Sequence, residues 1–175
     1  MALFELINLR KVRKAVLYLF CIVVSVWLQT MVLSRGGPAG VKPFFIPAMV
    51  VAVGMFEGGV WGGLLGLVTG LGCDLSYSDS TVLFTVLFTA FGFFSGLLTE
   101  YLINRRFIAW LLLAVLSLAV TAFCQLMPLW IFRGTAFRSL AGVALLQCLW
   151  SLPFAALSYF VVKFVAGRER RRLPG

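Results

Sequence analysis

The sequence predicts an all-α fold: a polytopic membrane protein built as a bundle of six transmembrane helices, with residues 1–175 forming a single membrane domain. Of the 175 residues, 62% are hydrophobic and 12% are charged, and the mean hydropathy is +1.04. In soluble domains about a quarter of residues are charged. Apolar runs near the length of about 20 residues that spans a bilayer recur along the chain. Short polar stretches separate these runs and leave no room for an extramembrane domain.

Prolines, glycines and charged residues between the apolar runs mark the ends of the expected helices. The first, 15–34, follows a basic stretch and is closed by Arg35-Gly-Gly-Pro. Its apolar run is long for a cleaved signal peptide and lacks a clear small-residue cleavage site, so we expect it to be retained. The second, 43–56, opens with a proline suited to a first helical turn, and we expect Pro47 to kink it. The remaining four helices are expected at 58–75, 81–103, 107–132 and 140–165.

The basic residues cluster at the predicted helix ends and set the expected topology. There are 15 Lys and Arg against 6 Asp and Glu. With six spans and the N-terminus inside, eleven of the 15 lie on the cytoplasmic side and four on the other. This positive-inside bias predicts that both termini lie in the cytoplasm. The topology-setting and anionic-lipid-contacting residues are Arg10, Lys11, Arg13, Lys14, Arg105, Arg106, Arg168, Arg170, Arg171 and Arg172.

Residue types absent from the chain narrow the possible chemistry. Histidine is missing, which removes histidine acid/base catalysis and most zinc sites. The four cysteines are widely spaced within apolar runs without a CxxC pair, so neither a metal centre nor a disulfide framework is indicated. With no soluble domain to carry it, nucleic-acid binding is not indicated either. We expect no catalytic residue, no metal and no cofactor.

A glycine series marks the third expected helix. Gly58, Gly62, Gly66 and Gly70 follow one another at intervals of four residues. In a bilayer, small residues at this spacing let two helix backbones approach closely. Gly92 and Gly96 of the fourth helix are weaker partners with the same spacing. The strip predicts either a packing seam inside the chain or a face that receives a helix of another protein.

Asp74 continues the glycine series by one further step of four. A carboxylate near membrane depth is a functional candidate by default, but one at the interface can also cap the next helix. Ser78, Asp79 and Ser80 are further N-cap candidates for the helix expected at 81. If Asp74 caps or braces the helix end, we expect Asp74→Asn to keep most of its hydrogen-bonding capacity.

Together these residues resemble the rod shape-determining protein family MreD. The resemblance rests on Lys42-Pro43 opening the second helix, the glycine-spaced third helix ending in Asp74-Leu75, the polar stretch before Thr81, and the late Trp150-x-x-Pro153. It covers about residues 10–165. Phe44 departs from the family, whose members often carry an acidic or amide residue just after the proline. The resemblance implies a fold similar to the six-helix substrate-binding subunits of energy-coupling-factor vitamin transporters.

The resemblance also implies a function. MreD-like proteins are non-enzymatic scaffolds of the bacterial cell-elongation machinery. They dock a bitopic MreC-like partner and act through it with MreB, RodA and a class B penicillin-binding protein to direct peptidoglycan synthesis and cell shape.

Two other functions remain open. A substrate-binding subunit of a small-molecule or vitamin transporter usually has longer polar outer loops and an Ala-x-x-x-Ala pair on its first helix. Here the expected outer loops are short, and Ala15 has no alanine at position 19. An intramembrane enzyme would need convergent polar groups at membrane depth. The sequence offers only Thr, Ser and Gln there, with no strong base.

Overall fold

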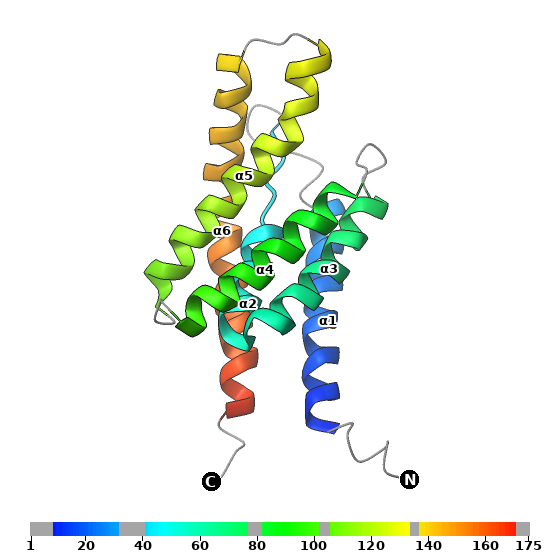
Figure 1. Cartoon of the computed structure of the whole chain (residues 1–175), viewed down its shortest axis with the longest axis vertical. Coiled ribbons are helices and arrows are strands. Elements are labelled where there is room, and N and C mark those ends of the chain that lie inside the picture. Colours follow the sequence, from blue (N-terminus) through cyan, green and yellow to red (C-terminus); the bar gives the residue numbers. More distant parts are fainter. Residues whose placement is uncertain (1–8, 32–40, 77–81, 102–105, 134–136, 171–175) are drawn as a thin grey trace.

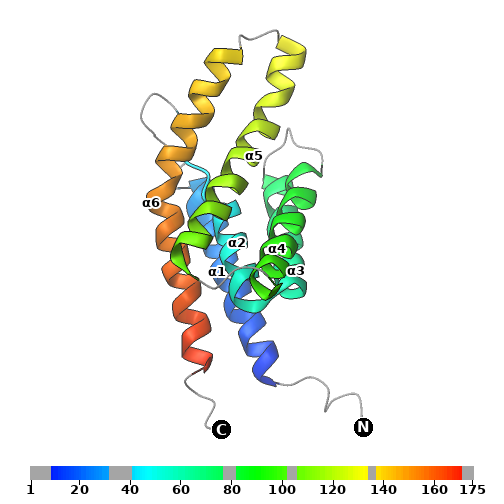
Figure 2. The same cartoon turned by 60° about the vertical axis from the view of Figure 1, so that its left-hand side comes forward.

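The computed structural model describes residues 9–31, 41–76, 82–101, 106–133 and 137–170. Across these ranges the chain forms six helices and no strand (Figure 1). The helices are α1 (Leu9–Met31), α2 (Ile46–Glu57), α3 (Gly59–Ser76), α4 (Leu83–Tyr101), α5 (Phe107–Arg133) and α6 (Phe137–Arg170). The first turn of α1 and the last turn of α6 lie at the same end of the molecule in both Figure 1 and Figure 2.

Four of the six helices, α3 to α6, are long and apolar enough to cross a membrane. The apolar part of α1, Val16–Met31, and the whole of α2 are shorter than a span. At 1.5 Å per residue, the 12 residues of α2 cover about 18 Å, against roughly 30 Å for a hydrocarbon core. The prediction of six full-length spans is therefore too simple for α1 and α2.

The predicted start of the second helix is wrong. Residues 41–45 are not helical, and α2 begins at Ile46, so Pro47 lies in its first turn and does not kink it. If the helix began at residue 43, the ring of Pro47 would clash with the carbonyl group of Pro43, four residues earlier. Pro47 also has no N–H group that could donate a hydrogen bond to that carbonyl. The second proline, rather than the first, therefore opens the helix.

The other predicted boundaries differ mainly at the charged ends of the chain. α1 begins at Leu9 instead of 15, and α6 runs from Phe137 to Arg170 instead of 140–165. A helix can continue through charged residues once it leaves the hydrocarbon, so hydropathy underestimates its length. The remaining predicted ends agree within two residues, or fall at positions 34, 81 and 103, which lie outside the described residues.

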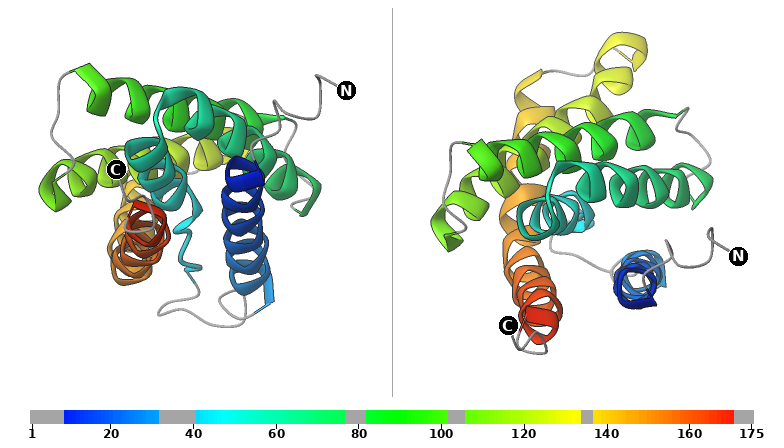
Figure 3. Two further views of the ribbon diagram at one scale, coloured as in Figure 1. Left: turned by 90° about the horizontal axis from the view of Figure 1, so that it is seen from below. Right: turned by 60° about the horizontal axis from the view of Figure 1, so that its bottom comes forward.

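α2 is the centre of the bundle. Every residue from Ile46 to Met55 is buried, because α2 packs against all five of the other helices. In Figure 3, α2 lies between α1, α6 and the α3–α4 pair. Its sequence, IPAMVVAVGMFE, is apolar on all sides, which is the pattern of a helix enclosed by protein.

The non-helical residues before α2 are held by polar side chains from helices on both sides. Gln29 of α1 is 2% exposed. Its Nε2 donates to the carbonyl oxygen of Pro43 and its Oε1 accepts from the amide N–H of Phe45. Ser151 of α6 accepts from the amide N–H of Phe44 at 2.7 Å. Irregular backbone at membrane depth is tolerated where such partners replace water.

Trp110 of α5 anchors the first turn of α2. Its side chain is fully buried, and its Nε1–H donates to the carbonyl oxygen of Ala48 at 3.2 Å. Its ring packs on Tyr159 of α6 with the centroids 4.8 Å apart. Trp110 thus holds α2, α5 and α6 together inside the bundle.

Replacing Gln29 by Leu removes both hydrogen bonds while keeping most of the side-chain volume. We expect Gln29→Leu to destabilise the protein by about 1–3 kcal/mol, because the carbonyl group of Pro43 and the N–H of Phe45 lose their partner in a buried place. A thermal-melting assay in detergent measures the loss. Thr99→Val is the control, since the Thr99 hydroxyl bonds the Ser95 carbonyl of its own helix at 2.8 Å. Equal melting temperatures for both variants would contradict this role of Gln29.

Candidate functional site

The glycines of α3 lie against the backbone of α4. The α3–α4 pair forms the most extensive interhelical contact. A Cβ atom added at Gly66 would overlap the carbonyl oxygen of Phe88, and one at Gly70 would lie 2.7 Å from the carbonyl oxygen of Phe84. The strip is therefore occupied by the chain's own α4, and a helix of another protein has no access to it in this structure.

Three glycines bring three helices to one point. A Cβ atom at Gly62 of α3 would overlap the carbonyl oxygen of Gly92 of α4 and lie 2.6 Å from the Cα of Gly54 of α2. A Cβ atom at Gly54 would in turn overlap the same Gly92 carbonyl oxygen. We define Gly54, Gly62 and Gly92 as the glycine junction. Gly54 is a residue that sequence reasoning missed, although it lies four residues before Gly58 and so continues the same spacing. The boundary between the second and third helices separates it from the rest of the series.

The other predicted glycines have different roles. Gly96 packs on the backbone of Gly58 and Gly59, so it belongs to the same α2–α3–α4 contact. Gly58 is the C-cap of α2, with φ of +95°, a conformation that glycine adopts without strain. It makes the turn that reverses the chain between α2 and α3. Nothing lies within 4 Å of a Cβ at Gly58, so conformation rather than close packing requires glycine there.

Asp74 caps α4 from the end of α3. Its Oδ1 accepts from the amide N–H of Phe84 at 3.1 Å. Its Oδ2 accepts from the amide N–H of Thr85 at 2.9 Å and from the Thr85 hydroxyl at 2.6 Å. The free N–H groups and the dipole of a helix N-terminus favour a carboxylate at this place. Asp74 thus fastens the end of the glycine strip. The cap candidates Ser78, Asp79 and Ser80 lie outside the described residues.

The basic residues gather where the chain ends. Positions 10, 11, 13 and 14 fall in the first turns of α1, and positions 168 and 170 fall in the last turns of α6. Figures 1 and 2 show these two helix ends on the same side of the molecule. Arg106, just before α5, is exposed. Arg105, Arg171 and Arg172 lie outside the described residues.

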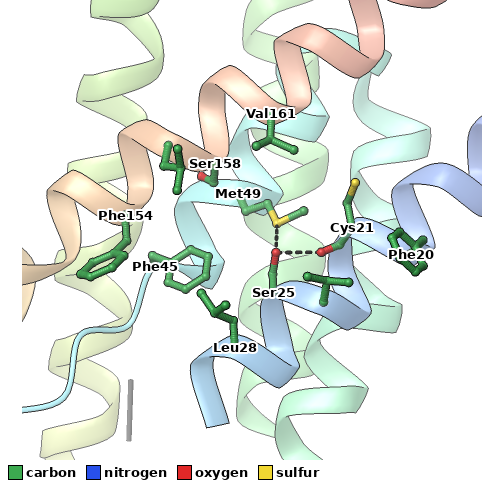
Figure 4. Close-up of a pocket in the computed structure, with 11 residues that line it drawn as sticks. Phe20, Cys21, Ser25, Leu28, Phe45, Met49, Phe154, Ser158 and Val161 are labelled. Atoms are coloured by element: carbon green, nitrogen blue, oxygen red, sulfur yellow. Dashed lines mark hydrogen bonds between the residues drawn. The ribbon is translucent and has the colours of Figure 1, made fainter. Parts of the chain in front are cut away.

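An apolar groove of about 180 Å³ separates α1 from α6. Its floor is Phe45 and Met49, at the start of the central helix, and the side chains of α1 and α6 face one another across this floor (Figure 4). We call this the α1–α6 groove. Its walls are Phe20, Cys21, Val24, Ser25 and Leu28 of α1 and Phe154, Leu157, Ser158 and Val161 of α6.

The hydroxyl groups in the α1–α6 groove are already bonded. The Ser25 hydroxyl lies 2.7 Å from the carbonyl oxygen of Cys21 and 3.1 Å from the sulfur of Met49. The Ser158 hydroxyl donates to the carbonyl oxygen of Ala155 at 2.7 Å. The groove therefore presents a chemically apolar surface that suits hydrocarbon better than a polar ligand.

A second groove, of about 310 Å³, lies between α5 and α6. These two helices extend beyond the other four at the end away from the chain's first and last helical turns (Figure 2). We call it the α5–α6 groove. It is lined by Ala119, Phe123, Leu126, Met127 and Trp130 of α5 and by Leu140, Ala141, Ala144, Leu145 and Cys148 of α6. Its lining includes three alanines, and Trp130 is half exposed.

The polar side chains of the described part serve the architecture of the bundle. Each buried side-chain nitrogen or oxygen atom there has a hydrogen-bond partner. The described residues contain no group of three His, Cys, Asp or Glu side chains that could hold a metal ion. Gln29 and Ser151 are buried polar residues that hold the backbone before α2 and that sequence reasoning missed. Their partners lie 14 to 16 and 107 residues away, a distance that no local pattern reveals.

Comparison with known proteins adds no relative. No protein-family model matches the sequence, and neither the curated proteins nor the solved structures give a significant match.

The glycine junction predicts a sharp contrast between two alanine substitutions in the same helix. Gly62→Ala should destabilise the protein by about 1–3 kcal/mol or more, because the added methyl group meets two backbones that can yield only by separating the helices. Gly72→Ala should be neutral or stabilising, since nothing lies within 4 Å of its Cβ position and alanine favours a helix over glycine. Yield and melting temperature in detergent measure both. Similar values for the two variants would contradict the junction.

The cap geometry reverses our expectation for Asp74→Asn. Both carboxylate oxygens accept hydrogen bonds, so an amide must place its NH₂ group against a donor on one side. We therefore expect Asp74→Asn to lose about 1–2 kcal/mol, close to the loss for Asp74→Ala and typical of a lost N-cap. Thermal melting of the three proteins tests this. An Asn variant as stable as the wild type would show that the carboxylate does not cap α4.

Proposed function

We propose that this protein is an MreD-like scaffold of the bacterial cell-elongation machinery. It lies in the inner membrane as six crossings with both termini in the cytoplasm and docks an MreC-like bitopic partner. Through that partner it acts with MreB, RodA and a class B penicillin-binding protein in peptidoglycan synthesis. Its fold is similar to that of the substrate-binding subunits of energy-coupling-factor transporters. The proposal includes no catalytic role.

The observation that carries the proposal is the apolar lining of both grooves. Pockets that bind small molecules usually combine an apolar lining with a few convergent polar groups. In the α1–α6 groove the two hydroxyls bond groups of the protein itself, and the α5–α6 groove is lined by Ala, Leu, Phe, Met, Trp and Cys. Such surfaces favour apolar protein segments or lipid over a polar vitamin, which supports a scaffold rather than a transporter subunit.

The arrangement of the helices is compatible with six crossings although α1 and α2 are short. α2 is enclosed by the other five helices, and the backbone groups of the non-helical residues before it are bonded within the protein. Gln29 and Ser151 serve these groups. The shared end of the first and last helical turns (Figure 1) also fits an even number of crossings.

The α5–α6 groove is the surface we assign to the helix of the partner. The residues that line it from α5 include positions 119, 123, 126 and 130, and those from α6 include positions 141, 144, 145 and 148. On each wall this spacing is that of one helical face. The alanines at 119, 141 and 144 allow a third helix to approach closely. Trp130 and Leu145, which are 50% and 72% exposed, stand at its sides as large apolar contacts.

Co-purification of the partner tests this assignment. Ala144→Trp fills the α5–α6 groove, and we expect it to lower the amount of MreC-like partner retained in mild detergent about tenfold, which corresponds to the usual cost of overpacking a tight contact. Leu149→Trp is the matched control, because Leu149 is 66% exposed on the same helix and lines neither groove.

Cell shape gives the second readout. In a strain depleted of the wild-type protein, Ala144→Trp should produce rounded cells, while Leu149→Trp should restore rods. Equal partner retention by the two variants would remove the α5–α6 groove as the docking site. Normal rods together with a vitamin-uptake defect in cells lacking the protein would replace the scaffold by the transporter function.

A further inference from the structure

The two walls of the α1–α6 groove both lead to basic residues. Seven residues make nearly two helical turns, so Arg13 and Lys14 occupy the register of Phe20 and Cys21, about 10 Å nearer the start of α1. In α6, Arg168 occupies the register of Val161, the same number of residues beyond the groove. α1 runs toward the groove from the end at which α6 finishes (Figures 1 and 2). Three cationic positions therefore continue the groove's two faces at one end.

The groove itself has the character of a hydrocarbon site at the protein's outer surface. Its floor is apolar and its hydroxyls are bonded within the protein. At its rim, Phe20 and Leu157 are 65% and 62% exposed. Two other groups close by have partners inside the bundle. Tyr18 donates to the Glu57 carboxylate at 2.6 Å, and the ammonium group of Lys163 lies 5.9 Å from the centre of the Tyr159 ring.

We infer that the α1–α6 groove binds an acyl chain of an anionic glycerophospholipid, with the phosphate group at the basic end of the groove. An apolar slot whose two walls lead to positions of basic residues is complementary to a molecule with one hydrocarbon end and one anionic end. The occupant is a lipid rather than a partner helix because the cytoplasmic flank of a bitopic helix is itself basic and would meet like charges here. This inference rests on the proposed topology, in which the basic end faces the cytoplasm, and not on the scaffold role.

Photochemical labelling tests the site in the full-length protein. The protein is purified in mild detergent, delipidated, and mixed with phosphatidylglycerol or phosphatidylcholine that carries the same diazirine-bearing acyl chain. After irradiation, the labelled peptides are identified by mass spectrometry. We expect phosphatidylglycerol to label residues 20–28 and 154–161 preferentially and phosphatidylcholine to label them several-fold less.

Charge variants separate the phosphate from the acyl chain. Arg13→Gln, Lys14→Gln and Arg168→Gln, alone and combined, should lower phosphatidylglycerol labelling of the groove roughly fivefold per charge removed and leave phosphatidylcholine labelling unchanged. Leu157→Trp, which narrows the groove at an exposed position, should lower labelling by both lipids. The controls are Arg138→Gln, at the other end of α6, and Leu149→Trp, outside the groove, and neither should change labelling.

Several results would overturn the inference. These are equal labelling of the wild type by the two lipids, labelling spread evenly over other helices, or an Arg138→Gln effect as large as that of Arg168→Gln. A membrane protein that co-purifies could also abolish lipid labelling of the groove and form crosslinks with residues 20–28. That result would assign the groove to a partner helix instead. If a variant fails to fold, the comparison of the two lipids on the wild type still decides.

Discussion

The close contact of three backbones at Gly54, Gly62 and Gly92 is the constraint on which the rest of the bundle depends. In lipid, helices gain little from the hydrophobic effect and associate through packing and hydrogen bonds. Because glycine has no side chain, α3 and α4 can approach each other and the central helix α2 closely at this junction. Asp74 then fastens the far end of the α3–α4 pair by capping α4. The remaining helices surround the core that these contacts define.

Local patterns predict the helices well and the centre of the bundle poorly. Hydropathy and the prolines, glycines and charged residues between apolar runs place all six helices, and the four-residue spacing identifies the glycines of α3. These patterns depend only on residues within a few helical turns. The start of α2 is misplaced because the steric effect of Pro47 four residues later outweighs the preference of Pro43 for a first turn. Gln29 and Ser151 escape sequence reasoning because their hydrogen-bond partners lie in other parts of the chain. Gly54 has the four-residue spacing to Gly58, but a helix boundary separates it from the glycines of α3. The grooves depend on how far helices diverge, which no local pattern encodes.

Because the small and polar residues are used to build the centre, the surfaces left for other molecules are apolar. The glycine strip, a natural candidate for docking, is covered by α4. The Asp74 carboxylate, a natural candidate for chemistry, is engaged in capping. In the described part, two grooves lie on different parts of α6. One is lined by alanines and Trp130, and the walls of the other lead to positions of basic residues. The first suits a helix and the second suits an anionic lipid, and both uses fit a membrane scaffold.

A disulfide across the α3–α4 pair is the most direct measurement of the central claim, which is that the glycine strip packs within one chain. A Cβ atom at Gly63 would lie 3.5 Å from the Cβ of Phe93, within the range for a disulfide. In a protein whose four native cysteines are replaced, Gly63→Cys with Phe93→Cys should form an intramolecular disulfide in membranes under mild oxidation. On a non-reducing gel the protein should migrate as a monomer, and both introduced cysteines should be protected from alkylation. Crosslinked dimers, or two freely alkylated thiols, would show that the strip faces another chain or the lipid and would contradict the account.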